Sequence, residues 1–295
     1  MSATTASTGP MKRRSALVTF MCTQPMGTAG LAVIILMTIA AVMPQVLSRY
    51  EPEAIDFASM LAPPSWDHPL GTDSFGRDIL TRLIYGARTA LTIGFLSSFI
   101  GCTLGGLLGL TSAFFGGRVD LLLQRFVDIV LSFPIIVLAL VVVAVLGKAS
   151  VAGVDFNLVF AIAIPIIPRA SRVVRSAALA VRAMPYIDAA RAGGYSSMHI
   201  ILRHMAPNIL APYMILLTAY IAQAILLEAS LSFLGLGVSE PKAAWGLMLA
   251  GDSASFYQEA PWMIIFPGVA ISLAVFAFNL LGDSLRDWFD PKFRT

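Results

Sequence analysis

The chain has 295 residues, of which 57% are hydrophobic and only 13% are charged, with a formal net charge of +3. Soluble globular domains carry about 25% charged residues, so the composition excludes an ordinary soluble domain and indicates a membrane protein. Two cysteines in apolar surroundings, Cys22 and Cys102, indicate neither a disulfide framework nor a metal site. We expect a chain embedded in the lipid bilayer that binds no metal and no nucleic acid.

The first 26 residues are expected to form a cytosolic tail. This tail contains Lys12, Arg13 and Arg14, and a basic cluster before an apolar run is typical of a secretory signal peptide. However, the uncharged run over residues 15–48 is far longer than the apolar region of about 7–15 residues in such a peptide. We therefore predict a retained first transmembrane helix over residues 27–47.

Five further apolar stretches follow, and a helix needs about 20 such residues to cross about 30 Å of hydrocarbon. Four of them are predicted to be the second, third, fifth and sixth spans, over residues 89–117, 129–147, 205–227 and 260–281. The fourth is free of charge only over residues 156–168 and must extend to residue 180. Its arginines, Arg169, Arg172 and Arg175, are then expected to reach the lipid headgroups. The predicted fold class is an all-α membrane protein with six transmembrane helices.

The placement of lysine and arginine predicts the orientation, because cytosolic loops are enriched in these residues. The N-terminal tail has basic residues and no acidic one, and the segment after the fourth span has many arginines and a single acidic residue, Asp188. Both are predicted to be cytosolic. Six spans then place the C-terminal tail, residues 283–295, in the cytosol as well, after a five-helix core over residues 88–282.

Residues 48–87 are more acidic and are predicted to form an extracytoplasmic loop with an interfacial helix. Thr72 or Asp73 can cap this helix. Asp73 with Arg77, and Asp78 with Arg82, are opposite charges four residues apart that would stabilise it. We expect the helix to lie on the outer membrane surface.

Residues 184–207, called the elbow below, form a charged segment between two apolar spans. The sequence predicts a first helix from Pro185 that ends at Gly193-Gly194, where a left-handed backbone is easily adopted. Ser196 or Ser197 would cap a second helix that stops before Pro207. The apolar face predicted for this second helix consists of Met198, Ile201, Leu202 and Met205. Such a face needs the membrane or a partner protein to bury it.

The elbow resembles the loop with which the membrane subunits of ABC importers dock onto their ATPase subunits. Asp188-Ala189-Ala190, Gly194 after three further residues, and Pro207 thirteen residues later keep the spacing of that loop. Aspartate stands in place of glutamate at 188, histidine in place of isoleucine at 204, and alanine in place of leucine at 206. The coupling residues implied by the resemblance are Asp188, Ala189, Ala190, Arg191, Gly194, Met198, Ile201, Arg203, His204 and Pro207. The alternative is an amphipathic elbow that rests on lipid.

Three more segments resemble one subunit of the dipeptide/oligopeptide/nickel importer family. They are residues 68–78 (HPLGTDSFGRD), residues 228–248, which contain EASLSFLGLG and WGLM, and residues 278–291, which begin FNLLGD. The resemblance implies a permease subunit with the type I importer fold in a bacterial or archaeal inner membrane. It also implies a second homologous permease, two ATPase subunits that use ATP and Mg²⁺, and an extracytoplasmic solute-binding protein. The substrate class implied is di- or oligopeptides or a similar small solute.

Two features within the spans are functional candidates. Gly101, Gly105 and Gly109 recur every four residues, which lets a second helix approach closely. That helix could belong to another membrane subunit or to the same chain. Glu228 is a carboxylate near the end of an apolar run, so it either lines the translocation pathway or is solvated at the external mouth.

An ion-gradient-driven secondary transporter is the alternative function, but it would require paired midplane charges and repeated halves, and neither is evident. The sequence around Gly147-Lys148 lacks the leading glycine and the Ser/Thr of a phosphate-binding loop. We therefore expect a non-catalytic chain without a bound cofactor, whose energy comes from ATP used by partner subunits.

Overall fold

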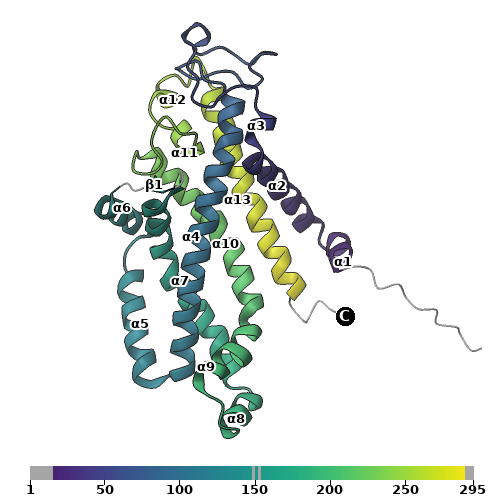
Figure 1. The fold of residues 1–295 in the computed structure, drawn as a ribbon, viewed down its shortest axis with the longest axis vertical. Helices are drawn as coiled ribbons and strands as arrows, with labels where there is room; N and C mark the ends of the chain where they lie inside the picture. The colour runs from purple at the N-terminus through teal and green to yellow at the C-terminus, as the bar shows by residue number, and fades with distance from the viewer. Residues whose placement is uncertain (1–15, 148–149, 152–153, 290–295) are drawn as a thin grey trace, which may run out of the picture.

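The computed structural model describes residues 16–147, 150–151 and 154–289. This part of the chain is an elongated bundle of helices, with long loops and the short helices α11 (Trp245–Met248) and α12 (Asp252–Ser255) at one end and the elbow at the other (Figure 1). The predicted basic cluster at residues 12–14 and the end of the predicted C-terminal tail lie outside the described residues. The predicted all-α architecture is confirmed, apart from a small hairpin of two two-residue strands, β1 (Ser150–Val151) and β2 (Val154–Asp155).

The N-terminal helices are α1 (Ala16–Thr23), α2 (Pro25–Val42) and the single turn α3 (Pro44–Leu47). The first predicted span, residues 27–47, is thus interrupted at Met43, whose backbone leaves the helical region (φ −121°, ψ 48°). Pro44 explains the break, because a proline disfavours helical angles in the residue before it.

The loop after α3 contains a 3₁₀ turn, η1 (Phe57–Ser59), and then leads into α4 (Ile79–Phe115). The prediction of a separate interfacial helix within residues 48–87 is wrong. The helical residues of this segment begin at Ile79 and form the first turns of the 37-residue α4. The cap is Asp78, which accepts a hydrogen bond from the backbone N–H of Thr81 at 2.8 Å. The predicted ion pair of Asp73 with Arg77 forms at 2.7 Å, but Asp78 contacts His68 rather than Arg82.

The third predicted span is not one straight helix. It is divided between α5 (Gly117–Leu131) and α6 (Ile135–Leu146), whose axes meet at 91°. Pro134 accounts for the break, since it disfavours helical angles at Phe133 and has no N–H to donate. In Figure 1, α5 runs beside α7 (Phe156–Arg182), while α6 projects sideways at the left edge of the bundle.

The fourth span is α7 (Phe156–Arg182), which confirms the predicted extension beyond the uncharged stretch. Two of its arginines do not turn toward lipid headgroups as predicted. Arg175 donates to both oxygens of Asp120 on α5, at 2.6 and 2.5 Å, and Arg172 pairs with Asp128 on the same helix. Sequence alone did not reveal these pairs, because they depend on α5 folding back along α7.

The remaining elements are α8 (Pro185–Ala192), α9 (Ser197–His199), the π-helix η2 (Ile200–Met205), the 3₁₀ turn η3 (Ala206–Ile209), α10 (Leu210–Phe233), α11 (Trp245–Met248), α12 (Asp252–Ser255) and α13 (Trp262–Phe289). The predicted stop before Pro207 is wrong, since helical structure runs from Ser197 to Phe233. Pro207 is tolerated because it lies at the start of a 3₁₀ turn, where its missing N–H costs little backbone hydrogen bonding.

Among the described residues, five helices are long and apolar enough to cross a membrane, and six if the bent pair α5–α6 is one span. The central helix α4 packs against α7, α10 and α2. A large apolar core joins these helices, and a second core, which includes Phe114, Val174, Ile187 and Met205, connects the elbow to α4 and α7.

Candidate functional site

The first arm of the elbow is α8, and local sequence accounts for its shape. Pro185 occupies the first turn, and the predicted end at the glycine pair is observed. Gly194 has a φ of +78°, and no atom lies within 4 Å of the position that a Cβ would occupy. The left-handed backbone, rather than crowding, therefore requires glycine here.

The second arm begins at Ser196, whose hydroxyl accepts a hydrogen bond from the backbone N–H of His199 at 3.3 Å. Ile200, Ile201 and Met205 are buried in the second core, together with Ile187 of the first arm. Both arms are thus anchored to α4 and α7 by apolar side chains.

The predicted apolar face of the second arm is wrong in its composition. Met198 and Leu202 are 65% and 56% exposed, whereas Ile201 and Met205 are buried within the chain. The error lies in grouping two pairs as one face: Met198 and Leu202, four residues apart, are both exposed, whereas Ile201 and Met205, also four apart, are both buried.

The exposed apolar surface of the elbow is therefore different from the predicted one. It consists of Met184, Tyr186, Tyr195, Met198 and Leu202. Sequence analysis missed the first three of these residues, although large apolar and aromatic side chains beside Pro185 and Gly194 were a usable signal. This surface lies at the end of the bundle opposite the long loops (Figure 1).

The other predicted coupling residues differ in exposure. Asp188, Ala189, Arg191, Gly194, Arg203 and Pro207 are exposed, His204 is half-buried and Ala190 is buried. Asp188 and Arg191 are 3.5 Å apart, an exposed pair that contributes at most about 1 kcal/mol. His204 lies in a ring cluster with Tyr195 and His199, at centroid distances of 6.1 and 5.7 Å.

The glycine stripe on α4 faces α7 of the same chain. A Cβ on Gly101 would lie 2.8 Å from Ile166, and one on Gly105 would clash with the backbone carbonyl oxygen of Ile167. Gly109 is equally close to α7, since its Cβ would lie 2.5 Å from the carbonyl oxygen of Ser171. Of the two possibilities that the sequence left open, the structure places these glycines in packing within the chain.

This contact predicts different outcomes for two adjacent alanine substitutions. Gly105→Ala should lower the melting temperature of the purified protein, because overpacking costs about 1–3 kcal/mol. Gly106→Ala is the matched control, since its Cβ would meet nothing closer than 3.8 Å. Thermal unfolding of both variants in the same detergent tests the contact, and equal melting temperatures would contradict it.

Glu228 lies in α10 and is 1% exposed. Its carboxylate accepts a hydrogen bond from Ser232 at 2.7 Å, and the Ser232 hydroxyl in turn accepts the backbone N–H of Val238 at 3.1 Å. In the isolated chain, Glu228 is therefore not solvated at an open mouth. It ties the end of α10 to the loop that follows.

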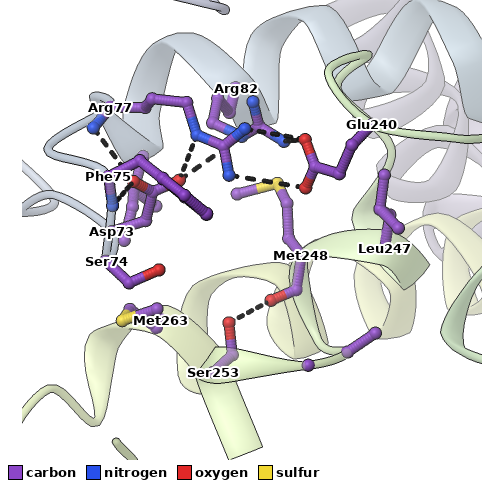
Figure 2. Close-up of a pocket in the computed structure, with 13 residues that line it drawn as sticks. Asp73, Ser74, Phe75, Arg77, Arg82, Glu240, Leu247, Met248, Ser253 and Met263 are labelled. Atoms are coloured by element: carbon purple, nitrogen blue, oxygen red, sulfur yellow. Dashed lines mark hydrogen bonds and ion pairs between the residues drawn. The ribbon is translucent and has the colours of Figure 1, made fainter. Parts of the chain in front are cut away.

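A cluster of charged residues joins the segment before α4 to the loop after α10 (Figure 2). Arg77 binds Asp73 and Glu240, each at 2.7 Å, although Glu240 is 163 residues away in sequence. Burial alone would lower the pKa of Arg77, but the bonds to Glu240 and Asp73 outweigh it and raise that pKa. Sequence analysis missed Glu240, because no local pattern relates it to Arg77.

Arg82 completes this charged cluster. It is 1% exposed, and its guanidinium donates to the backbone carbonyls of Pro52 and Pro241 at 3.0 and 3.3 Å. Below the charged groups lies a cavity of about 230 Å³, with Met248, Ser253 and Met263 on its opposite side (Figure 2). The charged cluster thus connects the segment before α4 with the loop after α10, above a small cavity that both polar and apolar residues line.

Comparison with known proteins decides the family. Residues 101–295 match the family described as "Binding-protein-dependent transport system inner membrane component". The chain belongs to this family. The permease is therefore a non-catalytic, multi-pass membrane component of an ABC importer, and the resemblance found in the sequence is confirmed.

Several curated relatives match the permease over most of its length. It is 40% identical to a putative peptide transport system permease protein of Brucella suis biovar 1 over 265 residues, covering 90% of this chain and 87% of the relative. It is 41% identical to the dipeptide transport system permease protein DppC of Alkalihalophilus pseudofirmus over 266 residues, covering 90% and 86%. It is 39% identical to the glutathione transport system permease protein GsiD of Escherichia coli O6:K15:H31 over 272 residues, covering 92% and 88%.

A solved structure supports the fold. The permease resembles a chain of the MetNI methionine ABC transporter in an inward-facing conformation, with a TM-score of 0.57 and 18% identity. The match covers 72% of the permease and 98% of that chain. This similarity establishes the type I importer permease fold alone.

Proposed function

We propose that the permease forms half of the translocation pathway of an importer for di- or oligopeptides or a similar small solute. In this proposal it pairs with a second homologous permease, two ATPase subunits and an extracytoplasmic solute-binding protein. The names of the relatives, which include peptide, dipeptide and glutathione permeases, support the substrate class. A secondary transporter is not favoured, because the family belongs to binding-protein-dependent systems.

The observation that carries the mechanism is the construction of the elbow. Met198 and Leu202 are exposed and can contact a partner protein, whereas Ile200 and Met205 on the same arm are buried within the permease itself. ATP-driven closure of the ATPase subunits would pull on the exposed residues of the elbow. Because the buried residues of the elbow pack against α4 and α7, these helices would move with it and switch the pathway from inward- to outward-facing.

The experiment that tests this function compares two energy sources. Uptake of a labelled dipeptide by cells that contain the complex should stop when the partner ATPases are inactivated by mutation. It should continue, at least briefly, when only the proton gradient is dissipated. Gradient-dependent uptake by the permease alone in liposomes would contradict the proposal.

The proposed topology has six spans, with both termini and the elbow in the cytosol. We expect an Ala54→Cys variant, exposed in the external loop, to react with a membrane-impermeant thiol reagent in intact cells whose outer membrane, if present, is permeabilised. A Ser197→Cys variant in the elbow should react only after lysis. The exposed native Cys22 is replaced by serine in both variants. Equal labelling of both positions would contradict the topology.

A further inference from the structure

Helix α5 lies at the side of the bundle and is held against α7 by its two acidic residues (Figure 1). Asp120 binds Arg175 of α7 at 2.6 and 2.5 Å, and Asp128 pairs with Arg172 of the same helix. Among the residues of α5, all of which the structure describes, only Val127 is buried. The polar side of α5 is therefore turned toward the protein.

The opposite face of α5 is exposed and combines apolar side chains with two arginines. Leu122, Phe126 and Ile129 are 69%, 62% and 63% exposed. Arg118 and Arg125 are also exposed, and neither makes a hydrogen bond or an ion pair within the described part of the chain. Positions 118, 122, 125 and 129 recur at spacings of four and three residues, so they share one face of the helix. We call these five residues the outward face of α5.

The beginning of α5 is level with the end of α7 that leads into the elbow. Arg182, the last residue of α7, donates to the carbonyl oxygen of Ala113 at 2.7 Å, and a Cβ on Gly116 would lie 2.8 Å from its guanidinium. Arg118 follows two residues later, and Arg125 lies about 10 Å further along the helix axis. Both arginines can reach the headgroup region on the elbow side, because a long arginine side chain extends toward the membrane surface.

The charge of the outward face selects its occupant. A second copy of the chain would bring four arginines into one apolar interface without free acidic residues, because Asp120 and Asp128 already bind α7. Such a like-charge contact is unfavourable. An anionic phospholipid complements both features of the face. Its phosphate accepts charge-assisted hydrogen bonds from arginine, and its acyl chains match the apolar side chains.

We propose that the outward face of α5 binds an anionic phospholipid of the leaflet that borders the elbow. Arg118 and Arg125 donate hydrogen bonds to its phosphate, and an acyl chain lies along Leu122, Phe126 and Ile129. Because α5 is tied to α7 by two ion pairs, the bound lipid stabilises the packing of these two helices. The inference goes beyond the proposed function and does not depend on the transported solute.

The first experiment uses the full-length permease in a neutral detergent and measures lipid binding by native mass spectrometry. The wild type should bind phosphatidylglycerol more tightly than phosphatidylcholine with the same acyl chains. We expect Arg118→Gln/Arg125→Gln to bind phosphatidylglycerol about 10- to 30-fold more weakly, since each arginine near a membrane surface contributes about fivefold. Both side chains are exposed and unpaired, so the variant should fold. Equal binding of the two lipids by the wild type, or unchanged binding by the variant, would overturn the proposal.

Three controls separate the outward face from general electrostatics and from a site for free phosphate. Arg49→Gln/Arg286→Gln removes the same charge from two other exposed arginines and should change the affinity for phosphatidylglycerol by less than about twofold. Leu122→Gln should weaken the binding of both lipids alike, because it alters only the surface for the acyl chain. Glycerol 3-phosphate, which has no acyl chain, should not displace the lipid. An equal loss in the Arg49→Gln/Arg286→Gln variant, or full displacement by glycerol 3-phosphate, would overturn the proposal.

A second experiment uses the complete transporter complex and shows whether protein covers the outward face instead. The complex with Arg118→Gln/Arg125→Gln should keep all its subunits at the wild-type ratio. Its melting temperature should fall below that of the wild type in nanodiscs that contain phosphatidylglycerol, but not in nanodiscs of phosphatidylcholine alone. Loss of another membrane subunit from the variant complex, or the same fall in both kinds of nanodisc, would overturn the proposal.

Discussion

Gly194→Val should abolish the coupling of ATP hydrolysis to transport while leaving membrane insertion intact. The left-handed conformation at this position costs a non-glycine residue about 1–2 kcal/mol, and more for a β-branched side chain. Relief of this strain would tilt the second arm and displace Met198 and Leu202 from their partner. We expect uptake and binding-protein-stimulated ATP hydrolysis to fall at least about tenfold, with reduced co-purification of the ATPases.

Two substitutions act as controls for this effect. Gly194→Asn should retain most of the activity, because asparagine adopts the left-handed conformation and the position has open space around it. Gly193→Ala should also be tolerated, since Gly193 has ordinary helical angles (φ −72°). Normal uptake and co-purification with Gly194→Val, at matched expression, would mean that the elbow rests on lipid and does not couple to the ATPases.

Arg82→Ala should strongly destabilise the end of the permease that carries the charged cluster. The substitution removes the donors to Pro52 and Pro241 and leaves Asp73 and Glu240 with Arg77 as their remaining cation in the cluster. Removing one partner from a buried charged group typically costs about 3–5 kcal/mol. We expect the lower part of this range, because Arg77 still compensates, and a melting temperature lowered by several degrees.

The control for Arg82→Ala is the substitution of an exposed arginine on the same helix. Arg88 also donates to a backbone carbonyl, that of Ala41 at 2.8 Å, but it is exposed to solvent in the isolated chain. Arg88→Ala should therefore lower the melting temperature much less. Arg82→Lys should recover only part of the loss, because an ammonium lacks the fork of the guanidinium. Equal effects at the two positions would show that burial of the charged cluster does not contribute to stability.

The sequence alone determined the features that depend on local backbone chemistry. Pro185 at a first helical turn, a cap at Ser196 or Ser197 (Ser196 in the structure) and the left-handed Gly194 were all predicted, because each depends on one or two neighbouring residues. The long apolar runs likewise predicted most of the spans. The spacing of Asp188, Gly194 and Pro207 in the elbow also indicated the importer family, since spacing along the chain is a property of sequence.

Only the tertiary structure decided which side chains face one another. It placed the glycine stripe of α4 against α7, buried Ile201 while leaving Met198 exposed, and brought Glu240 to Arg77. Spacing along the chain cannot reveal such contacts, because they depend on how distant segments meet. Helical spacing groups Met198 with Leu202 and Ile201 with Met205, but it does not show which of the two pairs is buried within the chain.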